Sequence, residues 1–239
     1  MVIDGIDGVG KGVFLNEFVA EAKKDGKTVF EVNKFWEKND FHPSLSEIGS
    51  ADIIVTSEPT FAGIGRYIRE ELIAKNGRSY TPQSVAEAYA LDRRILYEAV
   101  LLPALTAGIG VYQSRSLSSS IVYQRQSALD RGEDFSVDEI FAIPGNAFCY
   151  QHPMDFLLIP TINDAKEAIR RAEARDKDDN CEFENIDFQL KIKVHYESDE
   201  FRKVFEMAGI HVRYLDAGQS LEFSKKQAQD FYKNHLKLK

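Results

Sequence analysis

The stretch from Asp4 to Phe14, DGIDGVGKGVF, contains glycines and a lysine at a spacing that suits a polyphosphate. Gly5, Gly10 and Lys11 fit the pattern G-x-x-x-x-G-K, in which backbone N–H groups wrap the phosphates and the lysine reaches the outer ones. An apolar strand pattern precedes the loop and a helical pattern follows it, so the helix dipole would also attract the anion. The predicted ATP-binding residues are Asp7, Gly8, Val9, Gly10, Lys11, Gly12 and Val13.

Gly12 departs from this pattern because a serine or threonine normally follows the lysine. That hydroxyl is a direct magnesium ligand, and neither glycine nor the following Val13 offers an oxygen. Either other side chains and water hold the metal, or phosphoryl transfer is weak or absent. The loop therefore predicts nucleotide binding and leaves turnover open.

The composition indicates which kinds of partner the protein can bind and in which cellular compartment it is expected. The net charge of −8 disfavours a nucleic-acid partner, whereas local arginines can still bind small phosphorylated ligands. Cys149 and Cys181 lack paired metal-ligand spacing, which is typical of a reducing compartment. The apolar stretch at 99–111 is too short to span a bilayer, and the chain begins with a strand pattern. A cytoplasmic protein without membrane contact is expected.

Strands that alternate with helices must position the loop. The expected strands are 1–4, 27–36, 51–59, 108–114, 155–162 and 211–216, and the expected helices are 11–24, 63–75, 82–107, 118–132, 137–143, 163–175 and 224–236, with a further helix before the last strand. Ser136 is the expected N-cap of the helix at 137. This order implies parallel strands joined by crossovers, with ligands at their carboxyl ends. One domain over 1–239 is predicted, with a sheet of about five strands flanked by helices.

Three further stretches, together with the loop, resemble the thymidylate kinase family. They are TSEPTFAGIGRYIREEL at 56–72, AYALDRRILYEAVLLPALTAGIGVYQSRSLSSSIVYQ at 88–124 and AIRRAEAR at 168–175. The resemblance runs from Val2 to about Tyr196. It implies a P-loop nucleoside triphosphate hydrolase fold with a lid at about 170–182, and transfer of a phosphoryl group from ATP, with Mg²⁺, to dTMP.

The resemblance also implies roles for individual residues. Glu58 matches a carboxylate near the acceptor phosphate and the metal, and Arg69 and Arg93 match arginines that bind the acceptor monophosphate, a task suited to a planar fork of donors. Tyr89 takes the place of a phenylalanine that stacks on the thymine, and Tyr123 and Gln124 match a Tyr-Gln pair near the base. The catalytic set expected from the family is Lys11, Glu58, Arg115, Arg171 and Arg175.

Several positions depart from the family pattern. Ser57 replaces an arginine before Glu58, and Ser114 replaces an aspartate before Arg115, so a carboxylate beside the metal is lost. The phosphate loop carries no arginine, which leaves the lid to supply one, with Arg171 and Arg175 as candidates, and Asn180 stands near a further lid arginine of the family. The segment 35–52 is longer than the usual connection.

Other interpretations stay open at this point. Gly12 and Ser114 would suit a nucleotide-binding homologue that senses or recruits without catalysis, and the Arg115-Ser116 pair also occurs in deoxynucleoside kinases. Arg66, Arg170 and Lys177 could form solvated ion pairs, and Tyr89 and Tyr123 could be core aromatics. The five histidines show no ligand spacing. The apolar helix near 88–105 suggests a homodimer by family resemblance, although burial against the sheet would give the same pattern.

Overall fold

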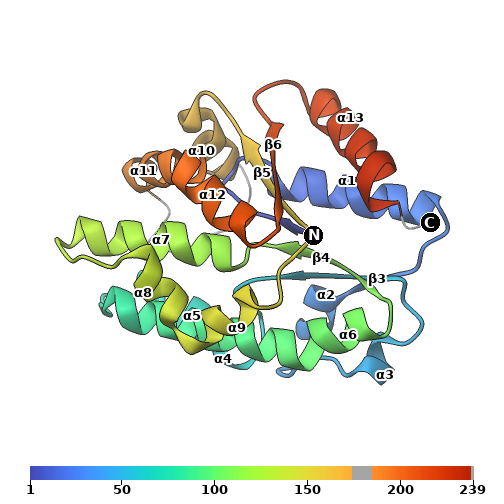
Figure 1. Cartoon of the computed structure of the whole chain (residues 1–239), viewed down its shortest axis with the longest axis horizontal. Helices are drawn as coiled ribbons and strands as arrows, with labels where there is room; N and C mark the ends of the chain where they lie inside the picture. The colour runs from blue at the N-terminus through green and yellow to red at the C-terminus, as the bar shows by residue number, and fades with distance from the viewer. Residues whose placement is uncertain (174–184, 238–239) are drawn as a thin grey trace.

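The protein folds around a parallel sheet of six strands, as shown by a computed structural model that describes residues 1–173 and 185–237 (Figure 1). The strands are β1 (Val2–Ile3), β2 (Val29–Glu31), β3 (Ile53–Ser57), β4 (Gly110–Ser114), β5 (Phe156–Thr161) and β6 (His211–Asp216). Their order across the sheet is β2-β3-β4-β1-β5-β6, and every pair is parallel. The P-loop α/β fold expected from the sequence is confirmed, and the six expected strands all join one sheet, which was predicted to have about five.

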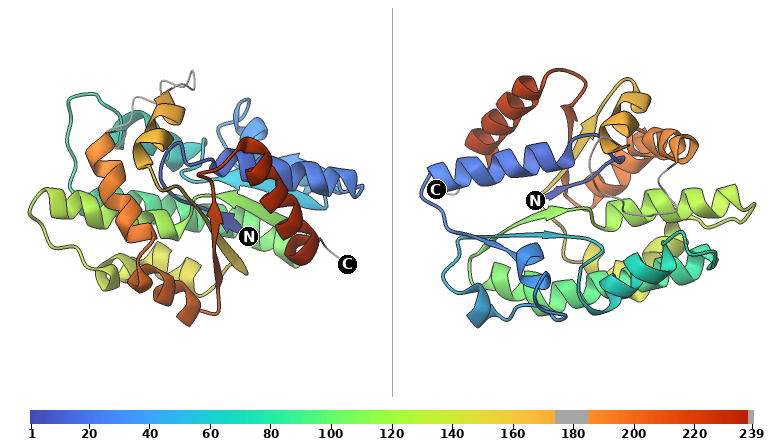
Figure 2. Two further views of the ribbon diagram at one scale, coloured as in Figure 1. Left: turned by 90° about the horizontal axis from the view of Figure 1, so that it is seen from above. Right: turned by 180° about the vertical axis from the view of Figure 1, so that it is seen from behind.

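Helices cover both faces of this sheet (Figure 1). They are α1 (Lys11–Lys24), α2 (Val32–Trp36), α3 (Leu45–Ile48), α4 (Gly63–Tyr67), α5 (Pro82–Leu96), α6 (Leu102–Thr106), α7 (Leu117–Asp130), α8 (Val137–Ala142), α9 (Pro144–Tyr150), α10 (Ala165–Glu173), α11 (Ile186–Tyr196), α12 (Asp199–Met207) and α13 (Leu221–Phe231), with π-helical turns η1 (Ile68–Leu72), η2 (Tyr97–Leu101) and η3 (Tyr232–Leu236). α13 lies alongside α1, as Figure 2 shows, and Gln229 donates to Glu17 across them.

Two apolar clusters hold the helices onto the sheet. One cluster joins the β1 and β5 strands to α1, α7, α11, α12 and α13, and includes the fully buried Phe14, Phe18 and Phe205. The other joins β3 to α2, η2 and α6, and is centred on Trp36, Ile54 and Leu96. Burial of a large apolar side chain contributes about 1.5–3 kcal/mol, so these two clusters are the main source of stability.

The strand order places the phosphate loop at a crevice. Strands β2, β3 and β4 lie on one side of β1 in the sheet, and strands β5 and β6 lie on the other side. The direction in which successive strands are added therefore reverses beside β1. Ligands of open α/β sheets bind outside the carboxyl ends of the strands at such a point. The loops after β1, β3 and β4 meet there.

The sequence predicted most elements, with specific corrections. The strand expected at 27–36 ends at Glu31, and Val32–Trp36 form α2, because Val32 and Trp36, four residues apart, bury their side chains in one apolar cluster. The helix expected at 63–75 ends at Leu72. α9 was not expected. Ser136 caps α8 as predicted, accepting from the Glu139 N–H.

No helix within residues 1–173 and 185–237 is long and apolar enough to cross a membrane.

Candidate active site

The phosphate loop lies between β1 and α1 in the conformation that its glycines allow. Gly10 precedes α1 with φ of 108°, and Gly8 has φ of 73°, a region that favours glycine. Lys11 Nζ donates to the carbonyl oxygens of Gly5 at 2.9 Å and Ile6 at 2.8 Å, so the ammonium group lies over the loop. Of the seven predicted ATP-binding residues, Asp7 to Gly10 form the loop and Lys11 to Val13 begin α1.

Gly12 occupies a place where a side chain would fit. A Cβ atom at this position would meet nothing within 4 Å, and the first turn of α1 contains no acidic side chain. Packing therefore does not require glycine here, and a serine would be accommodated.

Arg115 is brought to the loop by the end of β4, with a left-handed φ of 64°. Its guanidinium pairs with the carboxylate of Asp7 and lies 3.5 Å from that of Asp4. Burial would raise the pKa of Asp7, but Arg115 and Lys11 together hold it below its usual value. Asp7 is thus ionised at neutral pH, and its side chain is one-third exposed.

Asp4 holds Arg115 and the start of the phosphate loop in place through its buried carboxylate. The Asp4 side chain is fully buried and accepts hydrogen bonds from Ser118, Ser119 and Tyr196. The Gly5 N–H also donates to the Asp4 carboxylate, and the Arg115 guanidinium lies 3.5 Å from it. Asp4 was not among the residues predicted from the sequence, although a carboxylate just after a buried strand pattern was a usable signal.

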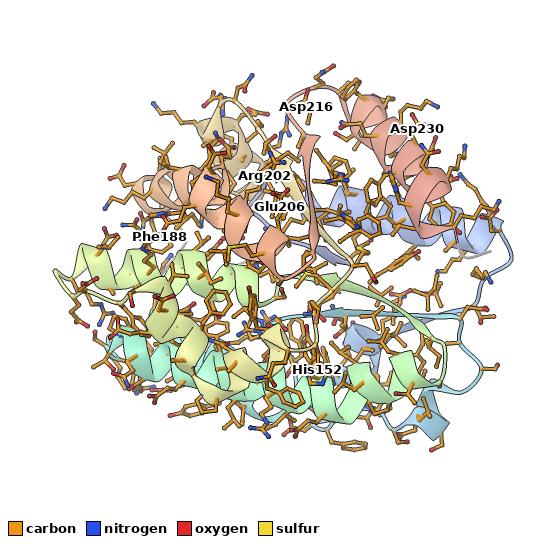
Figure 3. The ribbon with its side chains drawn as sticks, viewed as in Figure 1. His152, Phe188, Arg202, Glu206, Asp216 and Asp230 are labelled. Carbon is orange, nitrogen blue, oxygen red and sulfur yellow. The ribbon has the colours of Figure 1, made fainter. Side chains whose placement is uncertain are left out.

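Residues from α7 and α11 fix the orientation of Asp7. The Gln189 amide accepts from Asp7 N at 2.8 Å and donates to Asp7 Oδ2 at 3.0 Å. Tyr123 Oη lies 3.4 Å from the same oxygen. Phe188, labelled in Figure 3, extends from α11 towards α7, where its ring centroid lies 5.7 Å from that of Tyr123. Tyr123 therefore lies at the loop, as well as in the core.

On the other side of the crevice, Glu58 and Arg93 form a buried ion pair. Arg93 Nε donates to Glu58 Oε2 at 2.7 Å, and the two side chains are 1% and 3% exposed. The Arg93 guanidinium also donates to Ser120 and Asn146, while Gln113 donates to Glu58 Oε1 at 2.8 Å. Burial raises the pKa of Glu58 to about 7, against the opposing effect of Arg93.

Arg69 lies at the loop that follows Glu58 and Pro59. Its guanidinium donates to the carbonyl oxygens of Pro59 and Thr60 and lies 3.8 Å from the centroid of the Phe61 ring. The Asp92 carboxylate holds this loop by accepting from Thr60 N at 2.8 Å and Thr60 Oγ1 at 2.7 Å. Arg69 is half-buried and fixed in direction by the loop.

Tyr89 lies on α5 and Gln124 on α7, two helices that pack against each other. Tyr89 is half-buried against a small cluster formed by Ile68, Ile73 and Val85. Gln124 is 2% exposed, and its Oε1 has no hydrogen-bond partner among the described residues. A buried acceptor without a partner costs free energy, so this atom suits a donor on a ligand.

Arg171 lies on α10 beside a second part of the loop. It donates to the carbonyl oxygen of Ala217 at 3.0 Å and lines a cavity of about 240 Å³ with Gly8, Val9, Gly10, Val13 and residues at the start of α13. Asp216, labelled in Figure 3 at the end of β6, fixes this wall by accepting from Gly218 N at 2.8 Å. Arg175, Lys177 and Asn180 lie outside the described residues, as does most of the expected lid.

Other candidates lie apart from this crevice. A cavity of about 620 Å³ between α5 and the α8–α9 segment is lined by Glu87, Leu91, Glu133 and Glu139, and does not touch the phosphate loop. Arg170 pairs with Glu167 and Arg66 with Asp40 at the surface, as the ion-pair interpretation predicted. Across residues 1–173 and 185–237, no three His, Cys, Asp or Glu side chains form a group suited to a metal ion.

Comparison with known proteins identifies relatives of the chain. A model of the thymidylate kinase family matches residues 39–228, a range that begins after the phosphate loop. The thymidylate kinase of Clavibacter sepedonicus is 30% identical over 142 residues, which are 59% of this chain and 64% of that protein. A probable thymidylate kinase of Pyrococcus abyssi is 33% identical over 150 residues, 61% of this chain and 66% of that protein. The thymidylate kinase of an Exiguobacterium species is 26% identical over 235 residues, 97% of this chain and 92% of its own length. The chain thus spans just under two thirds of the first two relatives.

Proposed function

The chain belongs to the thymidylate kinase family, and we propose that it transfers the γ-phosphoryl group of ATP to dTMP or a related pyrimidine deoxynucleotide. The observation that carries this proposal is that two sets of charged side chains lie at the carboxyl ends of neighbouring strands. Lys11, Asp7 and Arg115 form the set after β1 and β4, and Glu58 and Arg69 form the set after β3. Phosphoryl transfer needs mainly positioning and charge stabilisation, which two such facing sets can supply.

The donor triphosphate would lie along the phosphate loop. Lys11 would exchange its contacts to the Gly5 and Ile6 carbonyls for the outer phosphates, and the N–H groups at the start of α1 would bind the remaining oxygens. The cavity beside Arg171 and Ala217 adjoins the loop and would receive the nucleoside part of ATP.

The acceptor would lie between α5 and α7. Arg69 would bind its monophosphate, and Arg93 would act from its buried position behind Glu58. Tyr89 would stack on the pyrimidine ring, while Gln124 Oε1 would accept a hydrogen bond from the base and so gain the partner that it lacks among the described residues. Tyr123 would approach the sugar beside Asp7.

Magnesium fits this site through Asp7. Its carboxylate is ionised, one-third exposed and adjacent to Lys11, whereas the Glu58 side chain is only 3% exposed. Mg²⁺ prefers oxygen ligands and keeps several waters, so one carboxylate and the phosphates suffice to hold it. When bound, the ion would neutralise charge on the phosphates. Glu58 would then orient the acceptor, and Asp7 would make the metal contact that the family resemblance implied for Glu58.

Arginines would stabilise the group in transfer. Arg115 is held at the loop by Asp4 and Asp7, from where it can approach the γ-phosphate. Arg171, which is fixed by Ala217, and Arg175 are proposed to act with it. A homodimer formed through α5 and α6 and a cytoplasmic location complete the proposal.

Two variants test whether ATP binds at the phosphate loop and dTMP at Arg69. Lys11→Met should raise the KM for ATP and lower kcat by roughly a hundredfold or more, because a charged phosphate contact is lost. Arg69→Gln should raise the KM for dTMP at least tenfold and leave the KM for ATP unchanged. Equal effects of Arg69→Gln on both substrates would contradict the separation into two sides.

A further inference from the structure

Gln113 is a buried amide in the middle of the sheet that touches both sides of the crevice. It lies on β4, is 1% exposed, and is in register with Val2 on β1 and Thr56 on β3. Its Nε2 donates to Glu58 Oε1 at 2.8 Å and to the carbonyl oxygen of Arg115 at 2.9 Å. One side chain thus joins the acceptor-side carboxylate to the turn that carries Arg115.

The amide uses both of its N–H donors in these contacts, since Nε2 has two hydrogens. Glu58 is then held from two directions, by Gln113 on Oε1 and by Arg93 on Oε2. The neutral Gln113 amide orients the Glu58 carboxylate without adding a charge. A second buried cation would carry its own desolvation cost, because Arg93 is already buried beside Glu58.

The second contact acts on the backbone of Arg115. This residue has the left-handed φ of 64°, which a non-glycine residue adopts only when its surroundings hold it there. The Arg115 N–H donates to Ile3 O at 2.9 Å, and Gln113 satisfies the carbonyl of the same residue. The turn is therefore tied to β1 through its N–H and to Glu58 through its carbonyl.

We propose that Gln113 is the positioning residue that sets Glu58 and Arg115 at a fixed separation, so that the acceptor and the transferring phosphoryl group meet in line. The inference rests on the proposed function and adds to it a residue on the sheet itself. Gln113 acts through Glu58 and Arg115 and does not touch the substrates.

Removing the amide should also change the titration of Glu58. The groups that face this carboxylate are Arg93 and Asp92 on α5, Tyr97 on η2 and Cys149 on α9. Burial already raises the pKa of Glu58 to about 7, and loss of a donor to the ionised form raises it further. Glu58 would then stay protonated to a higher pH.

The test compares Gln113→Met with the matched control Thr56→Val. Thr56 is the register partner of Gln113, is equally buried, and its Oγ1 has no hydrogen-bond partner among the described residues. Gln113→Met should lower kcat at least tenfold, move the acid limb of the kcat/KM profile up by about one pH unit, and move the NMR titration of the Glu58 carboxyl carbon equally. The NMR signal is assigned to Glu58 by comparison with the spectrum of the Glu58→Gln variant. Thr56→Val should change none of the three.

The outcomes separate this inference from the proposed function. An active wild type with an unshifted acid limb and an unshifted Glu58 titration in Gln113→Met would overturn the inference alone. Absence of phosphoryl transfer by the wild type would contradict the proposed function, and the NMR titration would still decide whether Gln113 controls Glu58. If Gln113→Met does not fold, Gln113→Asn, which keeps an amide that is too short for both contacts, should show the same upward shift.

Discussion

At the scale of single residues, three departures from the family pattern concern the proposed metal site. Gly12 leaves open space on α1, and Ser57 and Ser114 are register partners on the neighbouring strands β3 and β4. An arginine at 57 and an aspartate at 114 would be close neighbours of opposite charge, so their joint replacement leaves the local charge balance unchanged. The two serines are therefore one coupled change, and Gly12 is a separate one.

Restoring the missing oxygens should strengthen metal-dependent transfer. Gly12→Ser places a hydroxyl in open space at the start of α1, and Ser114→Asp returns a carboxylate at the end of β4. The double variant should raise kcat roughly tenfold or more and lower the Mg²⁺ concentration at half-maximal rate. Steady-state kinetics over a magnesium series measures both quantities.

The control for this prediction is Gly12→Ala combined with Ser114→Asn. It fills the same space and carries no hydroxyl at 12 and no charge at 114. A double variant that behaves like this control would show that the metal is held independently of both positions.

At the scale of elements, α11 connects the segment after the expected lid to the phosphate loop. Gln189 on this helix makes two hydrogen bonds to Asp7, and Tyr196 at its end reaches the buried Asp4. The orientation of Asp7, the proposed magnesium ligand, thus depends on a helix that lies about 180 residues further along the chain. Any movement of α11 would be transmitted directly to Asp7.

Gln189→Met should therefore impair catalysis more than stability. The variant keeps the volume of the side chain and removes both contacts to Asp7, so the KM for ATP should rise and kcat should fall several-fold, with a loss of about 1–2 kcal/mol in the free energy of unfolding. Kinetics and chemical denaturation measure the two effects.

Gln126→Met is the matched control, because Gln126 is also a buried glutamine with two hydrogen bonds, to Asp130 and His195, away from the phosphate loop. It should cost similar stability and leave the kinetics unchanged. Similar kinetic losses in both variants would mean that Gln189 has only a structural role.

The sequence predicted the elements that depend on local signals. The glycine spacing located the phosphate loop, and Ser136 located the start of α8, because both signals act within a few residues. Asp4 contacts Ser118, Gln113 contacts Glu58 and Gln189 contacts Asp7, and these pairs lie 114, 55 and 182 positions apart, so no local pattern indicated the contacts. α2 was missed because the apolar residues of 32–36 follow closely on the apolar strand residues Val29 and Phe30, and a short apolar run suits a strand as well as a short helix.

At the scale of the whole molecule, the long helical segment from Pro82 to Thr106 has both a buried and an exposed apolar side. Leu91 on α5 is 49% exposed and Leu105 on α6 is 53% exposed. α5 also packs on α7 and α9, so its buried side belongs to the fold of one chain. The exposed side is the proposed contact between two copies.

The variants Leu91→Glu and Leu105→Glu should separate such a dimer, because a charge placed in an apolar interface is costly to desolvate. Light scattering after size exclusion should give twice the 27.1 kDa of one chain for the wild type and a single chain for the variants. Leu129→Glu, at a residue 48% exposed on α7, is the control and should stay dimeric. A monomeric wild type would contradict the proposed dimer.

The proposed kinase activity is decided by measuring ADP release from ATP and Mg²⁺ by the purified chain in the presence of dTMP, dUMP, thymidine or no acceptor, with the phosphorylated product identified. We expect turnover with dTMP, formation of the diphosphate, and little ADP without an acceptor. Nucleotide binding without turnover for any acceptor would contradict the claim and identify a non-catalytic nucleotide-binding protein, whereas turnover with thymidine alone would identify a nucleoside kinase.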